Sequence, residues 1–316
     1  MDAPRLAIVM PCYNEQEVLP QTFATLLSLL EKWAAQDLIA ANSYLLCVDD
    51  GSRDRTWPII SEYHRKDIRV KGVKLAHNRG QQCALLAGLH TAMDRCDICI
   101  TIDADLQDDP GVMAQMIEQY NGGCEVVFGV RSSRHTDSWF KRTAAQSFYK
   151  LQNAMGIKTV YNHADFRLMS NRALHLLDEY GESNLYLRGI IPQIGLKTAI
   201  VEYPRSARTA GETKYPLSKQ IALSIDGITS FTAKPMRYIF MIGLVLMVID
   251  VAVAIWALFA YISHTAVSGW TSLILSVWFL GSLILMGLGI LGEYIGKIYV
   301  EVKHRPRFAV ETELFD

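Results

Sequence analysis

Short apolar runs alternate with stretches of helical periodicity through the first part of the chain. The apolar runs are bounded by polar residues and are typical of buried strands; they are Leu6–Met10, Tyr44–Val48, Val70–Ala76, Ile98–Ile102 and Val126–Gly129. Between them, apolar residues recur at helical spacing in Glu17–Trp33, Arg55–Arg65, Gln81–Met93 and Gly111–Tyr120. This alternation predicts an α/β domain with a mostly parallel sheet that is covered by helices on both faces.

Two much longer apolar runs, Ile239–Ile262 and Leu273–Gly292, lie near the C-terminus. Each is long enough to cross a bilayer core of about 30 Å as a helix. The loop 263–272 between them contains no Lys or Arg, whereas cationic residues flank the outer ends of both runs. By the positive-inside rule, both ends of this helix pair face the cytoplasm and the short loop faces outward. We therefore expect an integral membrane protein with a cytoplasmic α/β domain and cytoplasmic termini.

The same patterns divide the chain into four parts. We expect the α/β domain at 1–216, a juxtamembrane amphipathic helix at 217–236, two transmembrane helices at 237–296 and a cytoplasmic tail at 297–316. Asp250 falls near the middle of the first span, where an ionised carboxylate costs roughly 2.5–3.5 kcal/mol on insertion scales. We expect it to contact a neighbouring helix or subunit, with a role in handling lipid as the alternative.

The composition fits a membrane protein and argues against a nucleic-acid binder. Hydrophobic residues make up 50% of the chain, and the mean hydropathy of +0.14 is higher than a water-soluble domain needs. A formal net charge of -1 gives no general attraction to nucleic acid, so any anion site has to be built locally. The six cysteines include Cys96 and Cys99 in one C-x-x-C, without a second pair at metal-ligand spacing, and we expect reduced thiols.

A polar cluster begins where each of the five expected strands ends. The clusters are Pro11-Cys12-Tyr13-Asn14-Glu15, Asp49-Asp50-Gly51-Ser52, His77-Asn78-Arg79-Gly80, Asp103-Ala104-Asp105-Leu106-Gln107 and Val130-Arg131. In an open parallel sheet, ligands bind at the carboxyl ends of the strands. We therefore expect the five clusters to converge on one binding crevice.

The Asp103-x-Asp105 pair after the fourth expected strand predicts a divalent metal site. Its two carboxylates lie on the same side of an extended chain, and Gln107 can add a third oxygen. Hard oxygen ligands in this number suit Mg²⁺ or Mn²⁺, with substrate phosphates and water completing the coordination. The alternative is an exposed cap for the next helix, a role that residues 108–110 already provide.

The expected crevice combines several carboxylates with candidate cations. Asp49 and Asp50 from a neighbouring strand end bring the number of carboxylates to at least four, an arrangement that is unfavourable without a cation. Cationic side chains that could stabilise a diphosphate are Arg79, Arg131, Arg208 and Lys214. For the last two, which lie on a glycine-containing loop, a solvated surface position is the alternative. The chain has no G-x-x-x-x-G-K-[ST] or G-x-G-x-x-G motif, so P-loop and dinucleotide-binding functions lack their main support.

A series of ordered motifs extends these clusters along essentially the whole chain. They are Pro11-x-Tyr13-Asn14-Glu15, Asp49-Asp50-Gly51-Ser52, Asn78-x-Gly80-Gln81, Asp103-Ala104-Asp105-Leu106-Gln107, Asp165-Phe166-Arg167-Leu168, Gly211-Glu212-Thr213-Lys214-Tyr215, and Gly292-Glu293-Tyr294-Ile295-Gly296 through Arg305-Pro306-Arg307. The chain resembles family 2 glycosyltransferases of the GT-A fold, and within them the polyprenyl-phosphate branch of dolichyl-phosphate mannose synthases and bactoprenol glucosyltransferases. One departure is Asp165-Phe166, where several relatives carry a glycine before the aromatic residue, and it concerns the shape of the acceptor pocket.

The resemblance implies a role for each group of residues. The donor nucleotide would be held by Pro11, Tyr13, Glu15, Asp49 or Asp50, Arg79 and Gln81. The metal and the donor diphosphate would be held by Asp103, Asp105 and Gln107. The acceptor phosphate would be surrounded by Arg131, Arg142, Arg208 and Lys214. Asp165 and Arg167 would lie beside the reacting sugar and complete the catalytic set with Asp103 and Asp105. A phosphate monoester is already anionic, so we interpret Asp165 as a positioning group first and a base second.

The resemblance also implies a reaction. A single displacement with inversion would move one sugar onto polyprenyl (undecaprenyl) phosphate at the bacterial inner (plasma) membrane, for cell-envelope glycan modification. UDP-glucose is the leading donor, with UDP-N-acetylglucosamine, UDP-galactose and GDP-mannose as alternatives. Mg²⁺ or Mn²⁺ is the implied cofactor, and a homo-oligomer and a separate flippase are the implied partners. A processive synthase would carry Gln-x-x-Arg-Trp, which is absent; a non-catalytic, membrane-anchored nucleotide-sugar sensor is the alternative that is not an enzyme.

Overall fold

The computed structural model describes residues 3–131, 163–182, 187–204 and 269–315, together with scattered positions between 236 and 256. Several features predicted from the sequence fall outside these residues. They are the juxtamembrane helix expected at 217–236 apart from its last position, most of the loop 263–272, and the side chains of Asp250, Arg142, Arg208 and Lys214. These features remain predictions.

Strands and helices alternate through the first 131 residues in the predicted order. They are β1 (Leu6–Cys12), α1 (Leu19–Ala35), β2 (Tyr44–Asp49), α2 (Thr56–Lys66), β3 (Val70–Leu75), α3 (Gln81–Ala92), β4 (Ile98–Thr101), the 3-10 turn η1 (Pro110–Val112), α4 (Met113–Asn121) and β5 (Val126–Arg131). Further along are β6 (His163–Ser170), α6 (Asn171–Asp178), α7 (Leu187–Ile190), the 3-10 turn η2 (Ile191–Ile194), β7 (Thr198–Tyr203), α10 (Trp270–Val302) and β8 (Val310–Leu314).

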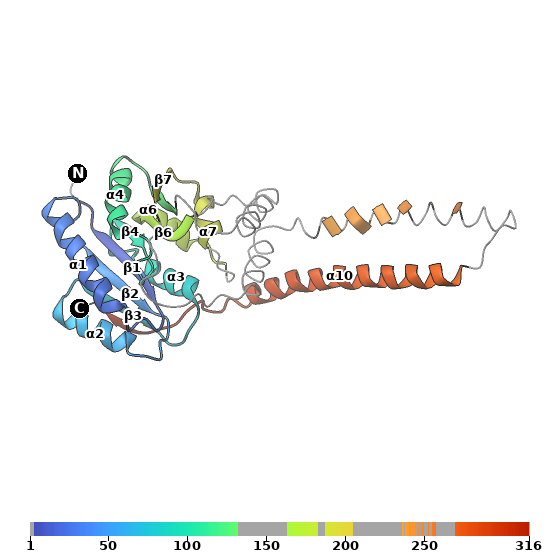
Figure 1. Cartoon of the computed structure of the whole chain (residues 1–316), viewed down its shortest axis with the longest axis horizontal. Coiled ribbons are helices and arrows are strands. Elements are labelled where there is room, and N and C mark those ends of the chain that lie inside the picture. The colour runs from blue at the N-terminus through green and yellow to red at the C-terminus, as the bar shows by residue number, and fades with distance from the viewer. Residues whose placement is uncertain are drawn as a thin grey trace. The chain divides into compact units, whose positions relative to one another are not determined.

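The eight strands form one sheet in the order β7-β5-β6-β4-β1-β2-β3-β8 (Figure 1). β1 pairs in parallel with β2 and with β4, β2 pairs in parallel with β3, and β5 pairs in parallel with β7. β6 lies antiparallel between β4 and β5, and β8 lies antiparallel on the outer edge of β3. The sheet is therefore mostly parallel, as the sequence predicts, with antiparallel strands added at two places.

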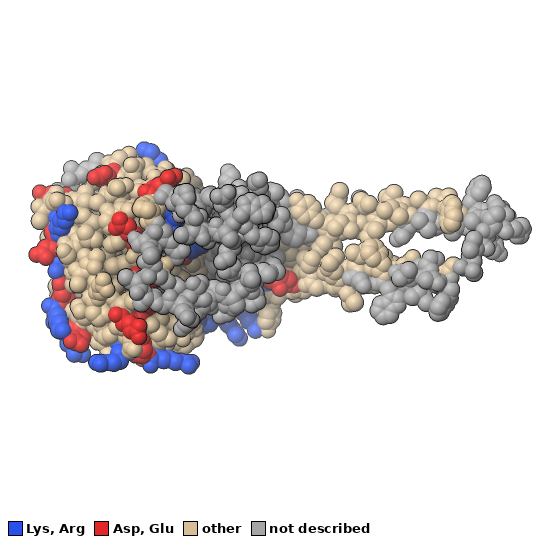
Figure 2. Space-filling model, in the orientation of Figure 1, with Lys and Arg blue, Asp and Glu red and all other residues tan. Residues whose placement is uncertain are grey.

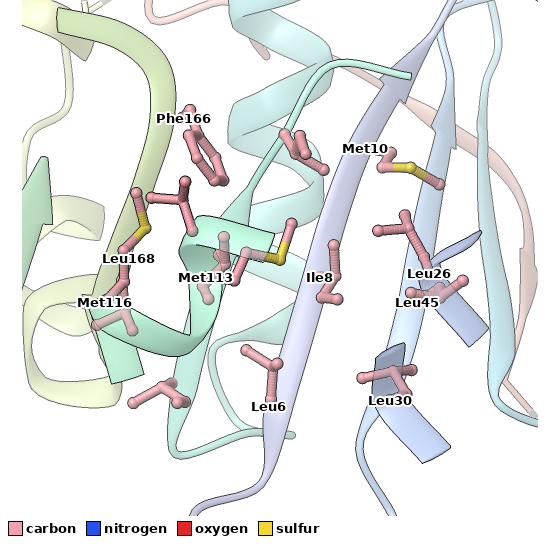
Figure 3. Packing of buried hydrophobic residues seen from close by; sticks show 14 of the residues in the cluster. Leu6, Ile8, Met10, Leu26, Leu30, Leu45, Met113, Met116, Phe166 and Leu168 are labelled. Atoms are coloured by element: carbon pink, nitrogen blue, oxygen red, sulfur yellow. The ribbon is translucent and has the colours of Figure 1, made fainter. Parts of the chain in front are cut away.

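Alternate residues of the central strand β1 face opposite layers of helices. Leu6, Ile8 and Met10 point toward the core that β1 forms with α1 and α4 (Figure 3). Val9 points the other way, toward Gly88 of α3. Because successive side chains of a strand lie on opposite faces, this apolar strand requires cover on both sides. The two helical layers provide it.

The last segment of the chain belongs to the α/β domain and is not a separate tail. Helix α10 falls in a second compact unit, Pro216–His304, whereas Arg305–Asp316 groups with the α/β domain through β8. The predicted tail 297–316 contains this strand, and a five-residue edge strand with charged residues, Val-Glu-Thr-Glu-Leu, gives no strong apolar signal. Residues 305–316 of the predicted tail therefore add an edge strand to the sheet, and the other predicted boundaries remain predictions.

The described residues contain one helix that is long and apolar enough to cross a membrane, by length and composition. It is the part of α10 from Phe279 to Val302, which overlaps the second predicted span. Most of the visible face of α10 in Figure 2 carries neither blue nor red atoms. The first predicted span, Ile239–Ile262, is described at only some positions, so a pair of transmembrane helices stays a prediction.

We expect Gly88→Ala to destabilise the α/β domain. A Cβ at this position would lie 2.4 Å from Cγ1 of Val9 and 2.8 Å from Cγ2 of Val48. Overpacking of this kind costs about 1–3 kcal/mol, which outweighs the ~1 kcal/mol that alanine gains over glycine in a helix. Thermal unfolding followed by circular dichroism should show a lower Tm. Gly292→Ala in α10, where nothing lies within 4 Å, is the control, and an equal effect of both variants would contradict the packing described.

Candidate active site

The carboxyl ends of β4, β1, β2 and β3 lie at one edge of the sheet, because these parallel strands are neighbours. The first two loops at this edge bind each other. The backbone N–H of Asn14 donates to Oγ of Ser52 at 2.9 Å, and Oδ1 of Asn14 accepts from the backbone N–H of Arg53 at 2.9 Å. Asn14 has a left-handed φ of 56°, which asparagine adopts more readily than most residues. The structure thus brings four of the five predicted clusters together.

Asp49 and Asp50 are both buried in the second loop. The carboxylate of Asp50 accepts hydrogen bonds from the backbone N–H groups of Arg79 (2.7 Å) and Gly80 (2.8 Å), which fixes the third loop at the start of α3. Oδ1 of Asp49 accepts from the backbone N–H of Ser52 at 3.2 Å, and its Oδ2 has no hydrogen-bond partner among the described residues. Burial raises the pKa of both carboxyl groups. Both buried carboxylates therefore hold the backbone of these loops in place through hydrogen bonds.

The loop after β4 gathers the predicted metal-binding residues. The side-chain Nε2 and the backbone N–H of Gln107 donate to the carboxylate of Asp105 at 2.8 and 3.3 Å. Nε2 of Gln81, the first residue of α3, donates to Oδ1 of Asp103 at 2.8 Å. Leu106 has a φ of 47°, a conformation that bulky residues rarely adopt and that is found most often at functional sites. The turn places Asp103, Asp105 and Gln107 with the predicted donor residue Gln81 in one cluster.

Asp108 is buried beneath this loop and does not cap the next helix, contrary to the sequence analysis. Its carboxylate accepts hydrogen bonds from Nε (2.9 Å) and Nη2 (3.0 Å) of Arg131 and from the hydroxyl of Tyr203 (2.7 Å). This pairing holds Arg131, at the end of β5, against the acidic loop and joins the fifth predicted cluster to the other four. Asp109 alone provides the cap, because its Oδ1 accepts from the backbone N–H of Gly111 at 2.8 Å.

Strand β6 places Asp165 and Arg167 in the interior next to the end of β4. The carboxylate of Asp165 accepts from Arg167 and, in a two-point contact, from Nε (3.1 Å) and Nη2 (3.0 Å) of Arg188. Nε2 of Gln82 adds a longer bond of 3.4 Å. Burial lowers the pKa of the Arg167 guanidinium, and Asp165 opposes that shift. The side chain of Arg188 is 39% exposed, so Asp165 connects a buried arginine to one that faces solvent.

Negative charge accumulates around Asp103. Burial, followed by the nearby carboxylates of Asp165, Asp108 and Asp105, raises the pKa of Asp103 to about 7, and Arg131 opposes this shift. Like charges in a poorly solvated crevice disfavour ionisation, and a bound cation would reverse that effect. The electrostatics of the crevice therefore favour a positively charged ligand.

The donor atoms fit a hard divalent cation that also binds substrate. Asp103 and Asp105 offer carboxylate oxygens and Gln107 an amide oxygen, the ligand types that Mg²⁺ and Mn²⁺ prefer. In the described part of the chain, no group of three or more His, Cys, Asp or Glu residues is arranged to hold a metal ion alone. A cation at this loop would thus take its remaining ligands from phosphate groups and water.

A pocket of about 280 Å³ lies beside the first three loops. It is lined by Tyr13, Gly51, Ser52, Arg53, Lys74, Leu75, Ala76, His77, Asn78 and Glu311. Tyr13 is 43% exposed, so its ring can offer a face to a planar ligand. Of the other predicted donor residues, Pro11 lies in β1 opposite Val48 of β2, and the backbone N–H of Glu15 donates to Oγ1 of Thr56 at 2.9 Å. They support the pocket's first loop and do not line it.

Three side chains of the site were not predicted from the sequence: Gln82, Asp108 and Arg188. Arg188 lies in a segment without a recognisable motif, and only the fold brings it to Asp165. Gln82 directly follows the predicted Gln81, and both glutamines face carboxylates of the crevice. Asp108 directly follows the Asp103–Gln107 motif, and this position could have identified it as a site residue. It was instead interpreted as part of the cap of the next helix.

An open α/β sheet with polar loops gathered at the carboxyl ends of its strands is typical of proteins that bind a ligand at that edge. Residues 7–194 match Glycosyl transferase family 2. The chain is 50% identical over 313 residues to the uncharacterized glycosyltransferase YkoT of Bacillus subtilis (strain 168), covering 99% of this chain and 93% of that protein. It is 37% identical over 311 residues to the bactoprenol glucosyl transferase of Shigella phage SfV, covering 98% and 99%.

Among solved structures, mannosyl-3-phosphoglycerate synthase from Rubrobacter xylanophilus matches with 14% identity and a TM-score of 0.47, covering 74% of each chain. The family match and the full-length relatives show that the chain belongs to glycosyltransferase family 2 and is a glycosyltransferase. The resemblance drawn from its motifs is thereby confirmed, as is a GT-A-like α/β fold with a mostly parallel sheet.

We expect Asp103→Asn to stabilise the metal-free protein at pH 8 and to have little effect at pH 4. The pKa of Asp103 is about 7 in the folded protein against an ordinary value of 3.8. Between these values the folded protein holds a proton that the unfolded chain has released, so stability falls as the pH rises toward 7. Asparagine does not ionise, so the free energy of unfolding is not lowered in this way at pH 8. The Tm of Asp103→Asn at pH 8 in EDTA should therefore rise by roughly 2–4 °C, which corresponds to ~1 kcal/mol in the free energy of unfolding for a domain of this size.

The control for this prediction is Asp37→Asn, which changes an exposed carboxylate on a surface turn. Its effect on the Tm should be small and the same at both pH values. A Tm of Asp103→Asn at pH 8 that is equal to or below that of the unaltered protein would contradict the charge crowding around Asp103.

Proposed function

We propose that this glycosyltransferase moves a single sugar from a nucleotide-sugar donor onto the phosphate of a polyprenyl lipid, which in bacteria is undecaprenyl phosphate. The observation that carries the proposal is the 37% identity to a bactoprenol glucosyl transferase over 98% of this chain, which includes the apolar C-terminal region. A lipid acceptor also gives a reason for the apolar helix Phe279–Val302 on the same chain as the acidic crevice.

UDP-glucose is the donor that this relationship favours, since several relatives of this kind are glucosyl transferases. The base would enter the pocket beside Tyr13, whose exposed ring can stack on it. UDP-N-acetylglucosamine, UDP-galactose and GDP-mannose are the alternative donors, because the residues that contact the sugar hydroxyls are not fixed by the motifs. The choice of sugar rests on analogy.

Asp103, Asp105 and Gln107 would hold Mg²⁺ or Mn²⁺ together with the donor diphosphate. When bound, the cation would neutralise negative charge on the departing diphosphate. The amide side chains set the geometry in advance: Gln81 orients Asp103 through its 2.8 Å hydrogen bond, and Gln107 orients Asp105 at the same distance. Ligands that are fixed before the donor binds lower the cost of reorganisation during the reaction.

Cationic side chains would hold the acceptor phosphate. The predicted set is Arg131, Arg142, Arg208 and Lys214. Arg131 has the best support, because Asp108 fixes its guanidinium beside the acidic loop through two hydrogen bonds of 2.9 and 3.0 Å. Arg188 is added to this set, since its side chain is partly exposed and Asp165 fixes its orientation. A planar guanidinium can make a two-point contact with phosphate.

The reaction proceeds by one displacement with inversion. An oxygen of the lipid phosphate forms a bond to the anomeric carbon while the bond from that carbon to the donor diphosphate breaks. The nucleophile is already anionic near neutral pH and needs little help from a base. Both carboxylate oxygens of Asp165 accept hydrogen bonds from arginines. Asp165 therefore acts by holding Arg167 and Arg188 in place, and most of the acceleration comes from orientation and charge stabilisation.

The cellular setting follows from the same proposal. The protein would lie in the bacterial inner (plasma) membrane with the α/β domain and both termini in the cytoplasm, and would serve cell-envelope glycan modification. A separate flippase would move the product across the membrane. Gly281, Gly287 and Gly289 on α10 would suit close helix packing in a homo-oligomer. A non-catalytic sensor is the weaker alternative, because it would not need intact carboxylates and arginines in the crevice.

The test is a transfer assay with the detergent-purified full-length protein. Undecaprenyl phosphate, Mg²⁺ or Mn²⁺ and a panel of UDP- and GDP-sugars are supplied, and the extracted lipid is analysed by mass spectrometry. We expect the lipid to gain the mass of one hexose, with UDP-glucose as donor, only when the metal and the lipid phosphate are both present. Failure of every donor to give a product, despite nucleotide binding, would reject the transferase function in favour of the sensor.

In the same assay, we expect Asp105→Asn to reduce transfer at least about 100-fold, the order of loss found when a charge-stabilising group is removed from an active site. The fold should be unaffected, because the hydrogen bond from Gln107 can persist to the asparagine oxygen. Asp109→Asn is the matched control: this exposed carboxylate lies in the same loop and only caps a helix, a role that asparagine fills equally well. Near-normal turnover of Asp105→Asn would exclude its assignment to the metal site.

A further inference from the structure

Strand β8 brings the C-terminal segment back to the α/β domain after helix α10. It pairs antiparallel with β3, and Phe315 directly after it is held by several contacts. The ring of Phe315 makes an edge contact with Tyr44 at a centroid distance of 5.8 Å, and the guanidinium of Arg95 lies 4.1 Å from its centroid. Nζ of Lys71 donates to the carbonyl oxygen of Phe315 at 2.5 Å. The segment is thus an anchored part of the domain.

This strand contributes one wall of the pocket that Tyr13 lines. The carboxylate of Glu311 on β8 forms an ion pair of 2.9 Å with Nζ of Lys74 on β3, and both residues line the pocket. The backbone N–H of Ala76 donates to the carbonyl oxygen of Ala309 at 2.9 Å, which fixes the start of β8 beside the end of β3. The side chains of Glu311 and Lys74 are 47% and 25% exposed. They therefore remain accessible to a ligand in the pocket.

Glu311 supplies the one carboxylate among the residues that the structure describes as lining this pocket. Asp49 and Asp50, one of which is predicted to hold the donor nucleotide, are both buried and do not line it. Both oxygens of Asp50 already bind backbone N–H groups of the third loop. A ring N–H group of a ligand in this pocket can therefore donate to the carboxylate of Glu311.

We propose that Glu311 and Lys74 recognise the edge of the donor's base, so that the C-terminal strand helps to select a base with a ring N–H beside a carbonyl group. This inference rests on the proposed function, in which the occupant is a nucleotide sugar. The carboxylate accepts a hydrogen bond from a ring N–H, and the ammonium group donates to the adjacent carbonyl, while Tyr13 offers a stacking surface. Uracil has this pair at N3–H and its neighbouring carbonyls, and guanine has it at N1–H and O6. Hydrogen bonds with charged partners are the stronger kind.

The test measures nucleotide binding and not transfer, by calorimetric titration of the full-length protein in detergent with Mn²⁺. The ligands are UDP and GDP, each with its derivative methylated at the ring N–H, which are 3-methyl-UDP and 1-methyl-GDP. We expect the unaltered protein to bind its preferred parent nucleotide at least about tenfold more tightly than the methylated form. Glu311→Ala should weaken binding of the parent by about tenfold and bring the ratio between parent and methylated form close to one.

The matched control is Glu313→Ala. Glu313 lies two residues further along β8, forms an ion pair of 3.6 Å with Arg95 and does not line the pocket. Its removal should leave the ratio unchanged, and the Tm values of both variants report any loss of the strand itself. A ratio that stays high in Glu311→Ala, or that is close to one in the unaltered protein, would overturn the inference while leaving the proposed function intact. Binding of neither nucleotide would overturn both.

Discussion

The crowding of carboxylates around Asp103 is the constraint on which the rest of the site depends. Asp105, Asp108 and Asp165 each raise the pKa of Asp103, which burial already raises. Such a crevice is tolerable only where opposite charge is supplied, and the protein supplies part of it with arginines. Arg131 neutralises Asp108, and Arg167 and Arg188 neutralise Asp165. Asp103 accepts a hydrogen bond from Gln81 and Asp105 accepts one from Gln107, and these two carboxylates belong to the loop predicted to hold a cation.

The topology of the sheet explains how these groups meet. The acidic loop follows β4, but two of its counter-charges come from strands that lie beyond it in the sheet, Arg167 on β6 and Arg131 on β5. Because β6 lies antiparallel between two strands of the opposite direction, its first residues reach the edge where β4 and β5 end. Asp165 therefore stands beside Asp103 although 62 positions separate them in the chain. The antiparallel insertion thus brings the charged residues of β6 to the edge at which the parallel strands end.

The sequence was sufficient for the elements with strong apolar signals and for residues at the ends of parallel strands. Runs such as Leu6–Met10 are buried on both faces, so their pattern identifies them without tertiary information. β8 was missed because five residues are few: Val-Glu-Thr-Glu-Leu alternates, but an edge strand with two glutamates carries little apolar signal. Arg188 was missed because its function depends on contact with Asp165, which no local pattern encodes. Asp108 was misassigned because a carboxylate after a turn fits both a cap and a buried ion pair.

The central claim is that the crevice binds a nucleoside diphosphate together with a divalent cation. The most direct measurement is the affinity of the purified full-length protein for UDP and GDP at pH 8, determined by calorimetry with saturating Mn²⁺ and again with EDTA. The account predicts that Mn²⁺ tightens binding of the preferred nucleotide by at least about tenfold. The reason is that the ion takes some of its ligands from Asp103 and Asp105 and others from the diphosphate. An affinity that is the same with Mn²⁺ and with EDTA would contradict it.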